Sequence, residues 1–393
     1  MQTSHKTHKK HTEAPSRIFH HIKGKYPGAT IVFFAGIHGN ETAGVNALNK
    51  VLKTLSAKDI SGEIYGVYGN IKALKENKRF LVSDLNRMWT LKQLNAIKDK
   101  EELNPEEQEQ KELIYEIDQL LASIKNPIYF IDLHTTSSKS LPFITINDAL
   151  INRKFSSCFP LPIVLGIEEY LEGPLLSHLN TLGYVSIGFE SGQHTDPLAI
   201  KNCETFIYLA LNHAGHLKLN NLHNYEDKLK KAAREVSSIF EVIYKYHIEE
   251  KEDFSMKEGF KSFQKIKRGT LLATTNGNKI YSDYTAKLFM PLYQKSGNDG
   301  FFIIKPIPRV LLKLSEVLRR IKADSLMTLL PGISWHNKSL GVLKANLSVT
   351  RFMTKSIFHL FGYRNKQLDE SHLLLYNRER VSKNEMYQNE KWY

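Results

Sequence analysis

The stretch Ile31–Glu41, IVFFAGIHGNE, predicts a buried strand followed by a turn that carries a histidine and a glutamate. Its first five residues are β-branched, aromatic or small, a composition that favours a strand. Gly36 ends the run, and His38 and Glu41 follow, three residues apart. Apolar residues in Thr42–Leu55 recur at helical spacing, so we expect a helix after the turn. The imidazole and the carboxylate would then lie at the carboxyl end of a strand, where open α/β sheets bind ligands.

Length and composition favour a large globular chain with more than one domain. It has 393 residues, of which 41% are hydrophobic and 10% aromatic, enough for a sizeable core. We find no apolar run long enough to span a membrane and no secretory signal at the N-terminus. The only cysteines, Cys158 and Cys203, exclude a disulfide framework and favour a reducing compartment. We therefore expect a cytoplasmic protein without a membrane partner; a homo-oligomer stays open.

The formal net charge of +13 raises the question of a nucleic-acid partner. Basic residues concentrate in the first 25 residues, in Lys228–Arg234 and from Asn337 onward, but elsewhere they are mixed with acids. No RNP, zinc-finger or helix-turn-helix signature accompanies them, so we do not expect nucleic acid as the main ligand. A positive field that draws in a small anionic, carboxylate-bearing substrate explains the charge more simply.

From Ala29 to about Phe240, predicted strands alternate with predicted helices, which implies an α/β fold with helices on both faces of a sheet. The strands are Glu63–Tyr68, Pro127–Leu133, Leu161–Leu165 and Tyr184–Phe189 in addition to the opening stretch, and the helices after Thr42–Leu55 are Pro105–Lys125, Asp196 to His213 and Lys228–Phe240.

The composition changes near Ile243, where short β-rich segments alternate with Gly and Asn turns. We expect a small β domain there, followed by a helix over Val310–Ile321 and a polar segment from Arg364 on. The predicted organisation is a disordered basic tail (1–16), a catalytic domain (17–240), a small β domain (241–308) and a helical or irregular C-terminal extension (309–393).

His134 is the best candidate for a third ligand beside His38 and Glu41. It follows the apolar strand in YFIDLHTT and so lies at the carboxyl end of a second strand. Two imidazoles and one carboxylate, with a fourth position open, are typical of catalytic zinc. Asp132 could fix a ligand imidazole from behind or could be a structural carboxylate. The simpler alternative is that His38 lies in the turn with its hydrogen bonds made by neighbouring residues and binds no metal.

Glu190, in VSIGFESG, is the predicted general base, because it follows another apolar strand between two glycines. A carboxylate in reach of an activated water can take its proton and pass it to a leaving amine. Glu168 and Glu169 compete for this role, but they form a charged pair ahead of Tyr170 and rank below Glu190.

The segment RFLVSDLNR, Arg79–Arg87, supplies cationic candidates for substrate binding. Arg87 offers a planar fork suited to a carboxylate, and Asn86 adds a donor beside it. Arg79 could stabilise the oxyanion that develops when water attacks a carbonyl. Surface positions are the alternative for both arginines.

Together these motifs resemble the succinylglutamate desuccinylase/aspartoacylase family of the zinc carboxypeptidase superfamily. The resemblance rests on GxHGNE, Gly69-Asn70, Arg79, DLNR, DLH and FESG, in this order, between about residues 30 and 200. It implies a mixed central sheet flanked by helices, one zinc ion per chain on His38, Glu41 and His134, and Glu190 as the base. It further implies that Arg79 polarises the scissile carbonyl and that Asn86 and Arg87 hold the substrate carboxylate.

The implied reaction is hydrolysis of a small N-acyl amino acid to a carboxylate and a free amino acid. The chain departs from aspartoacylases where those carry a Tyr and an Arg before the base-bearing strand: Leu176 and Asn180 stand near these positions, and no arginine occurs between Arg153 and Arg234. The acyl group and the amino acid therefore stay open. A carboxypeptidase acting on short peptides and a non-catalytic basic scaffold are the alternatives.

Overall fold

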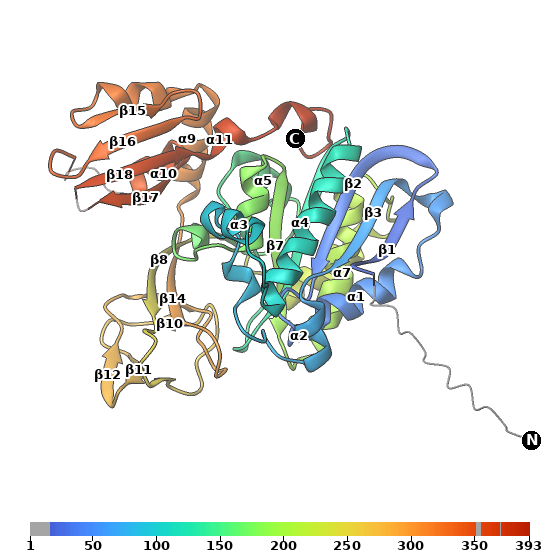
Figure 1. Cartoon of the computed structure of the whole chain (residues 1–393), viewed down its shortest axis with the longest axis horizontal. Helices are drawn as coiled ribbons and strands as arrows, with labels where there is room; N and C mark the ends of the chain where they lie inside the picture. The colour runs from blue at the N-terminus through green and yellow to red at the C-terminus, as the bar shows by residue number, and fades with distance from the viewer. Residues whose placement is uncertain (1–15, 351–354, 370) are drawn as a thin grey trace, which may run out of the picture.

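The computed structural model describes residues 16–350, 355–369 and 371–393, and its centre is one large mixed sheet (Figure 1). Strands β2, β4 and β7 run parallel in the middle, and β1 pairs antiparallel with β3. Strand β5 is antiparallel to β7 but parallel to β6. In spatial order the eleven strands found in these ranges are β1 (Ile18–Lys23), β3 (Ser61–Tyr68), β2 (Tyr26–Ala35), β4 (Ile128–Thr136), β7 (Val185–Gln193), β5 (Phe143–Ile146), β6 (Ile163–Leu165), β8 (Ile239–His247), β14 (Asp299–Pro306), β13 (Ala286–Phe289) and β10 (Lys265–Ile266).

Helices cover both faces of this sheet, because successive side chains of the central strands point to opposite sides. In β2, Ile31 and Phe33 pack with helices α1 (Ala43–Leu52) and α7 (Pro197–His213). Val32 and Phe34 pack on the other side with α4 (Pro105–Ser123). The other helices around the sheet are α2 (Ile71–Glu76), α3 (Leu91–Lys98), α5 (Leu150–Ser156), α6 (Leu175–Thr181) and α8 (Leu222–Ala232). The predicted α/β fold with a mixed central sheet is therefore confirmed.

The segment predicted as a small β domain continues the large sheet and adds a second one. Strands β8, β14, β13 and β10 extend the sheet, whereas β12 (Asn278–Tyr281), β11 (Leu271–Thr275) and β9 (Phe254–Met256) form a separate three-stranded sheet. Both lie on the lower left of Figure 1. The exact domain boundaries stay a prediction.

The region after residue 308 is more regular than expected. Helix α9 (Arg309–Arg320) agrees with the predicted helix, but a four-stranded antiparallel sheet follows instead of a helical or irregular extension. Its strands are β15 (Ile333–Asn337), β16 (Val342–Asn346), β18 (His372–Asn377) and β17 (Tyr363–Asp369), accompanied by α10 (Lys355–Leu360) and α11 (Arg378–Val381). Strand β15 alternates between buried and more exposed positions, and β16 mixes buried with half-buried positions, so these two strands lack the continuous apolar runs of the central sheet.

The chain then returns to the large sheet, where its last residues lie (Figure 1). Tyr387 is fully buried, and Trp392 donates a hydrogen bond from its indole nitrogen to the Tyr129 hydroxyl at 3.0 Å. The C-terminal segment thus completes the core beside β4.

Two further expectations need comment. The helix predicted over Lys228–Phe240 is wrong in position: α8 ends at Ala232, and β8 begins at Ile239. Arg234 and Glu235 adopt positive φ angles of 51° and 59°, which end the helix. The predicted disordered tail lies, except for residue 16, outside the described residues.

Candidate active site

His38, Glu41 and His134 meet at the carboxyl ends of β2 and β4. Each offers a ligand atom, and these atoms all lie within 4.8 Å of one another. The Glu41 carboxylate lies between the two imidazoles, with Oε1 2.7 Å from His38 Nδ1 and Oε2 3.0 Å from His134 Nδ1. Burial alone would raise the pKa of Glu41, but the two imidazoles hold it well below its usual range. Parallel pairing of Ala35 with Leu133 aligns the two strand ends.

The outer nitrogen of each imidazole is held by a second carboxylate. His38 Nε2 lies 3.1 Å from Asp84 Oδ1, and His134 Nε2 lies 2.7 Å from Asp132 Oδ2. Burial disfavours charged His134, but Asp132 and Glu41 outweigh it and raise the pKa of this imidazole well above its ordinary value. Such outer carboxylates orient histidine ligands in metal sites. Two oriented imidazoles and one carboxylate with a free approach fit a zinc ion.

Glu190 lies beside this cluster on β7, directly across the strand pair from His134. Its side chain is buried, and Oε2 has no hydrogen-bond partner among the described residues. Burial raises the pKa of Glu190 to about 8, and the carboxylates of Glu41 and Asp132 contribute to the increase. A carboxyl group tuned in this way can hold or release a proton near neutral pH.

Arg79 is held by acids at the same site. Its Nε and one terminal nitrogen donate to Asp84 Oδ2 at 3.2 and 3.0 Å, and the other terminal nitrogen lies 3.5 Å from Glu41 Oε1. Asp84 therefore joins Arg79 to His38. Burial opposes ionisation of Asp84, yet His38 and Arg79 hold its pKa well below the usual range.

Asn86 and Arg87 lie in a short 3₁₀ turn, Leu85–Arg87. The Asn86 side-chain oxygen accepts a hydrogen bond from the backbone nitrogen of Leu175 at 2.9 Å. Arg87 donates to the backbone oxygen of Asn86 at 2.9 Å and to Asp299 Oδ2 at 2.7 Å. Asp299 belongs to β14 and also binds Lys245 at 3.0 Å, so the β-rich segment holds the guanidinium in place.

The seven site residues predicted from the sequence line one cavity of about 130 Å³. They are His38, Glu41, Arg79, Asn86, Arg87, His134 and Glu190. Leu176 lies in its wall, whereas the Asn180 side chain accepts a hydrogen bond from Asn152 at 3.0 Å instead. Of the competing acids, Glu168 lines the cavity, and Glu169 pairs with His359 and Arg378 outside it. The apolar wall is formed by Ile167, Leu171, Pro174, Leu176, Met290, Leu292 and Phe302.

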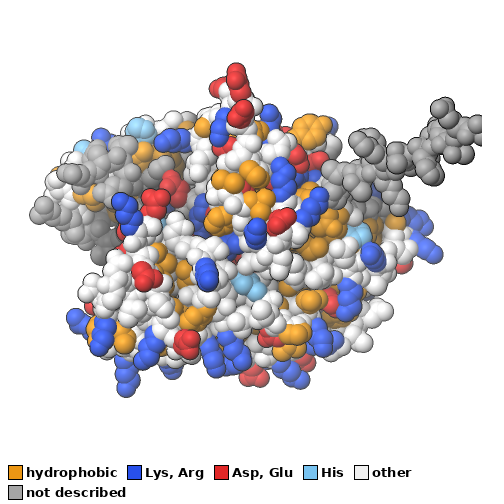
Figure 2. Space-filling model, turned by 60° about the horizontal axis from the view of Figure 1, so that its bottom comes forward, with side chains coloured by type: hydrophobic (Ala, Val, Ile, Leu, Met, Phe, Trp, Pro, Cys, Tyr) orange, Lys and Arg blue, Asp and Glu red, His pale blue; other side chains and the backbone are white. Residues whose placement is uncertain are grey.

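The cavity lining holds more acids than arginines: beside Arg79 and Arg87 it contains Glu41, Asp132, Glu168, Glu190 and Asp299. Both cavity arginines are ion-paired with carboxylates. On the face shown in Figure 2, Lys and Arg side chains are interspersed with Asp and Glu side chains. The attraction of an anionic substrate would therefore depend on local donors more than on a general positive field.

Sequence reasoning missed three residues of the site. Asp84 stands inside the DLNR motif without an assigned role, although its spacing from Arg79 was visible. His194 lines the cavity, and its Nδ1 lies 2.7 Å from the Thr135 hydroxyl oxygen. Asp299 is 212 residues from Arg87 in the chain, so no local pattern could link the two.

The fold and the cavity define an α/β protein with a candidate metal centre at the ends of parallel strands. Comparison with known proteins is consistent with this description. The family model described as succinylglutamate desuccinylase/aspartoacylase catalytic domain matches residues 27–175. The resemblance predicted from the sequence, to the succinylglutamate desuccinylase/aspartoacylase family, is confirmed by this match.

Curated relatives match a short part of the chain. Succinylglutamate desuccinylase from Photorhabdus laumondii is 38% identical over 68 residues, which is 17% of this chain and 21% of that protein. The enzyme of the same name from Serratia proteamaculans is 44% identical over 61 residues, 15% of this chain and 19% of that protein. The matched segment thus spans about a fifth of the length of these relatives.

Solved structures share the fold over a longer range. A succinylglutamate desuccinylase/aspartoacylase from Rhodobacter sphaeroides has a TM-score of 0.57 at 13% identity, covering 73% of this chain and 88% of that one. The product-bound ectoine utilization protein EutE (DoeB) from Ruegeria pomeroyi has a TM-score of 0.55 at 17% identity, covering 72% and 87%. At these identities the likeness establishes the fold.

Proposed function

We propose that the chain is a zinc-dependent amidohydrolase that cleaves the amide bond of a small N-acyl amino acid. The carrying observation is that three potential ligands lie next to a buried carboxyl group. The ligand atoms of His38, Glu41 and His134 converge within 4.8 Å, and Glu190 Oε2 beside them has no hydrogen-bond partner in the described part of the chain. The family match supports the same reaction class.

His38, Glu41 and His134 would hold the zinc ion. When bound, the ion supplies Lewis-acid chemistry, which in zinc hydrolases lowers the pKa of water to about 7. Glu190 takes a proton from the attacking water and delivers it to the departing amine, which needs a carboxyl group that changes protonation state near neutral pH. Transfer of this proton to the amine breaks the C–N bond and restores the Glu190 carboxylate, and the free amino acid and the acyl carboxylate then leave.

The arginines bind the substrate. Arg79 reaches the Glu41 carboxylate and would place positive charge where the carbonyl oxygen becomes negative. Arg87 keeps donors beyond those used by Asp299 and the Asn86 backbone, because a guanidinium carries five N–H groups. These donors would grip the substrate carboxylate, with the Asn86 amide beside them.

The test combines metal analysis with a substrate screen. Purified protein is expected to contain one zinc ion per chain and to release free amine from one or more N-succinyl or N-acetyl amino acids. A chelator should abolish the release, and added zinc should restore it. A parallel panel of short peptides distinguishes the deacylase from a carboxypeptidase. A folded chain that binds no zinc and cleaves neither panel would instead be a non-catalytic scaffold.

A further inference from the structure

Helix α9 turns most of its apolar side chains toward solvent. Val310, Leu314, Val317 and the adjoining Ile321 are spaced by four, three and four residues, so they share one face. They are 75%, 43%, 54% and 67% exposed, and Leu311 beside them is 43% exposed. We call these five residues the α9 apolar face.

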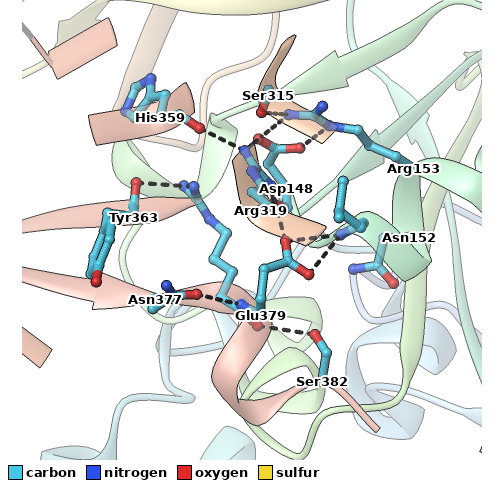
Figure 3. Close-up of polar contacts among 12 residues, drawn as sticks. Asp148, Asn152, Arg153, Ser315, Arg319, His359, Tyr363, Asn377, Glu379 and Ser382 are labelled. Atoms are coloured by element: carbon cyan, nitrogen blue, oxygen red, sulfur yellow. Dashed lines mark hydrogen bonds and ion pairs between the residues drawn. The ribbon is translucent and has the colours of Figure 1, made fainter. Parts of the chain in front are cut away.

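The opposite side of α9 carries two buried polar residues, Ser315 and Arg319, beside Leu312, which packs against the core; Figure 3 shows the polar contacts. Arg319 donates to the backbone oxygen and the carboxylate of Asp148, at 2.6 Å each, and to Glu379 at 3.0 Å. Ser315 donates to the backbone oxygen of Leu360 at 2.9 Å. A surface helix ordinarily buries its apolar stripe and exposes its polar one. Here ion pairs and hydrogen bonds fix the reverse orientation.

Basic side chains run alongside the α9 apolar face. At 100° per residue, Arg309, Lys313 and Arg320 fall within an arc of about 40° that adjoins Val317. Arg320 is paired with Glu316 at the far edge of this arc, so Arg309 and Lys313 are its unpaired cations among the contacts of the described residues. Lys322 follows the helix. Residues 309–393 hold 15 Lys and Arg against 7 Asp and Glu, so this fifth of the sequence carries most of the net charge of +13.

We propose that the α9 apolar face docks the protein onto an anionic lipid surface. A helix with one apolar face and a flanking row of cations inserts its apolar side chains at the headgroup boundary, while the cations bind anionic lipids. No helix in the described ranges is long and apolar enough to cross a membrane, so the contact would be peripheral. This proposal is independent of the proposed reaction. It departs from the expectation that the protein has no membrane partner, which rests on the lack of an apolar run long enough to span a membrane.

A second copy of the chain fits this face less well. A 12-residue helix is about 18 Å long and about 10 Å wide, so its face offers roughly 200 Å². Stable interfaces bury about 800 Å² on each partner. A symmetric contact would also place the two basic rows near each other, which opposes association.

The test is flotation of the full-length protein with lipid vesicles. The protein should float with phosphatidylcholine vesicles that contain phosphatidylglycerol, and it should float much less with phosphatidylcholine alone or in high salt. The triple variant Val310→Glu, Leu314→Glu, Val317→Glu should reduce the bound fraction about tenfold or more. Arg309→Gln and Lys313→Gln should each weaken binding about fivefold.

Leu91→Glu is the matched control, since Leu91 is 76% exposed and belongs to a different helix, α3, and this variant should bind like the wild type. The proposal is overturned if the wild-type protein fails to float with anionic vesicles or if the triple variant floats equally well. Sedimentation analysis tests whether this face binds a second copy of the chain. A wild-type dimer that does not bind vesicles, together with a monomeric triple variant, would assign the face to a second copy. The two charge-removing variants alter only exposed side chains, so they still decide the question should the triple variant misfold.

Discussion

The hydroxyl of Tyr387 accepts a hydrogen bond from the backbone nitrogen of Val185 at 3.0 Å, across 202 residues of sequence. The same hydroxyl donates to the backbone oxygen of Ile128 at 2.5 Å. One side chain near the end of the sequence therefore joins the first residues of β4 and β7, the two strands that carry His134 and Glu190.

Tyr387→Phe should destabilise the protein by about 2 kcal/mol, because it leaves a buried N–H and a buried C=O without their partner while it preserves the ring. Urea unfolding should show a lower midpoint with an unchanged slope. Tyr115→Phe is the control, since Tyr115 is 61% exposed on α4. An unchanged midpoint in Tyr387→Phe would mean that the hydroxyl does not bridge the strands.

Glu190→Gln should keep zinc but lose about 10²–10⁴-fold in kcat, the usual contribution of a general acid–base group. Amine release and zinc content should be measured on the same preparation. Glu63→Gln, on strand β3 between β1 and β2, serves as the control because Glu63 does not line the cavity, and it should retain activity. Undiminished turnover in Glu190→Gln would remove this residue from the mechanism.

Asp299→Ala should raise KM about tenfold with little change in kcat. Asp299 takes one N–H of Arg87 and so orients the guanidinium that would hold the substrate carboxylate. A substitution that weakens binding of the substrate and of the transition state equally raises KM and leaves kcat unchanged. Asp299→Asn keeps an acceptor oxygen and should restore part of the affinity. An equal loss of kcat would contradict a purely positioning role.

The stability of the protein should fall as the pH drops from about 6.5 to about 4, in part because of His216. Burial lowers the pKa of His216 from 6.5 to about 4, although its hydrogen bond to the backbone oxygen of Ser61 opposes the decrease. In the unfolded chain, His216 binds a proton below about pH 6.5. In the folded protein, the same imidazole stays neutral until about pH 4. The contribution of neutral His216 to the free energy of unfolding is therefore complete above pH 6.5 and decreases as the pH falls toward 4. The total loss is at most about 3 kcal/mol.

His216→Phe should flatten this part of the profile of unfolding free energy against pH. The control is His223→Gln, because the His223 side chain is 96% exposed and should leave the profile unchanged. If the wild type and His216→Phe lose stability in parallel over this range, another group is responsible.

The central fold could be predicted because its strands are buried on both faces and so form continuous apolar runs. This holds for Ile31–Ala35 and for the strands that carry His134 and Glu190. A residue that can bind metal or carry a proton follows each run: His38, His134 and Glu190. The candidate site could therefore be located from three separate segments.

What sequence reasoning missed depends on contacts between distant segments. Strand β5 has only four residues. It pairs with β7 on one side and with β6 on the other, and long segments of the chain separate it from both strands. Strand β15 has only five residues, of which one is buried, so its hydrophobic pattern is weak. The link between Arg87 and Asp299 depends on how the β-rich segment folds back, which local propensity does not encode.

The register of β4 against β7 restricts how such a protein can diversify. His134 is opposite Glu190 in adjacent parallel strands, and side chains alternate between the two faces. An insertion of a single residue in either strand would turn one of them to the opposite face of the sheet. Changes in substrate preference during evolution should therefore accumulate in the cavity wall and in the β-rich segment that supplies Asp299, while the lengths of these two strands stay constant.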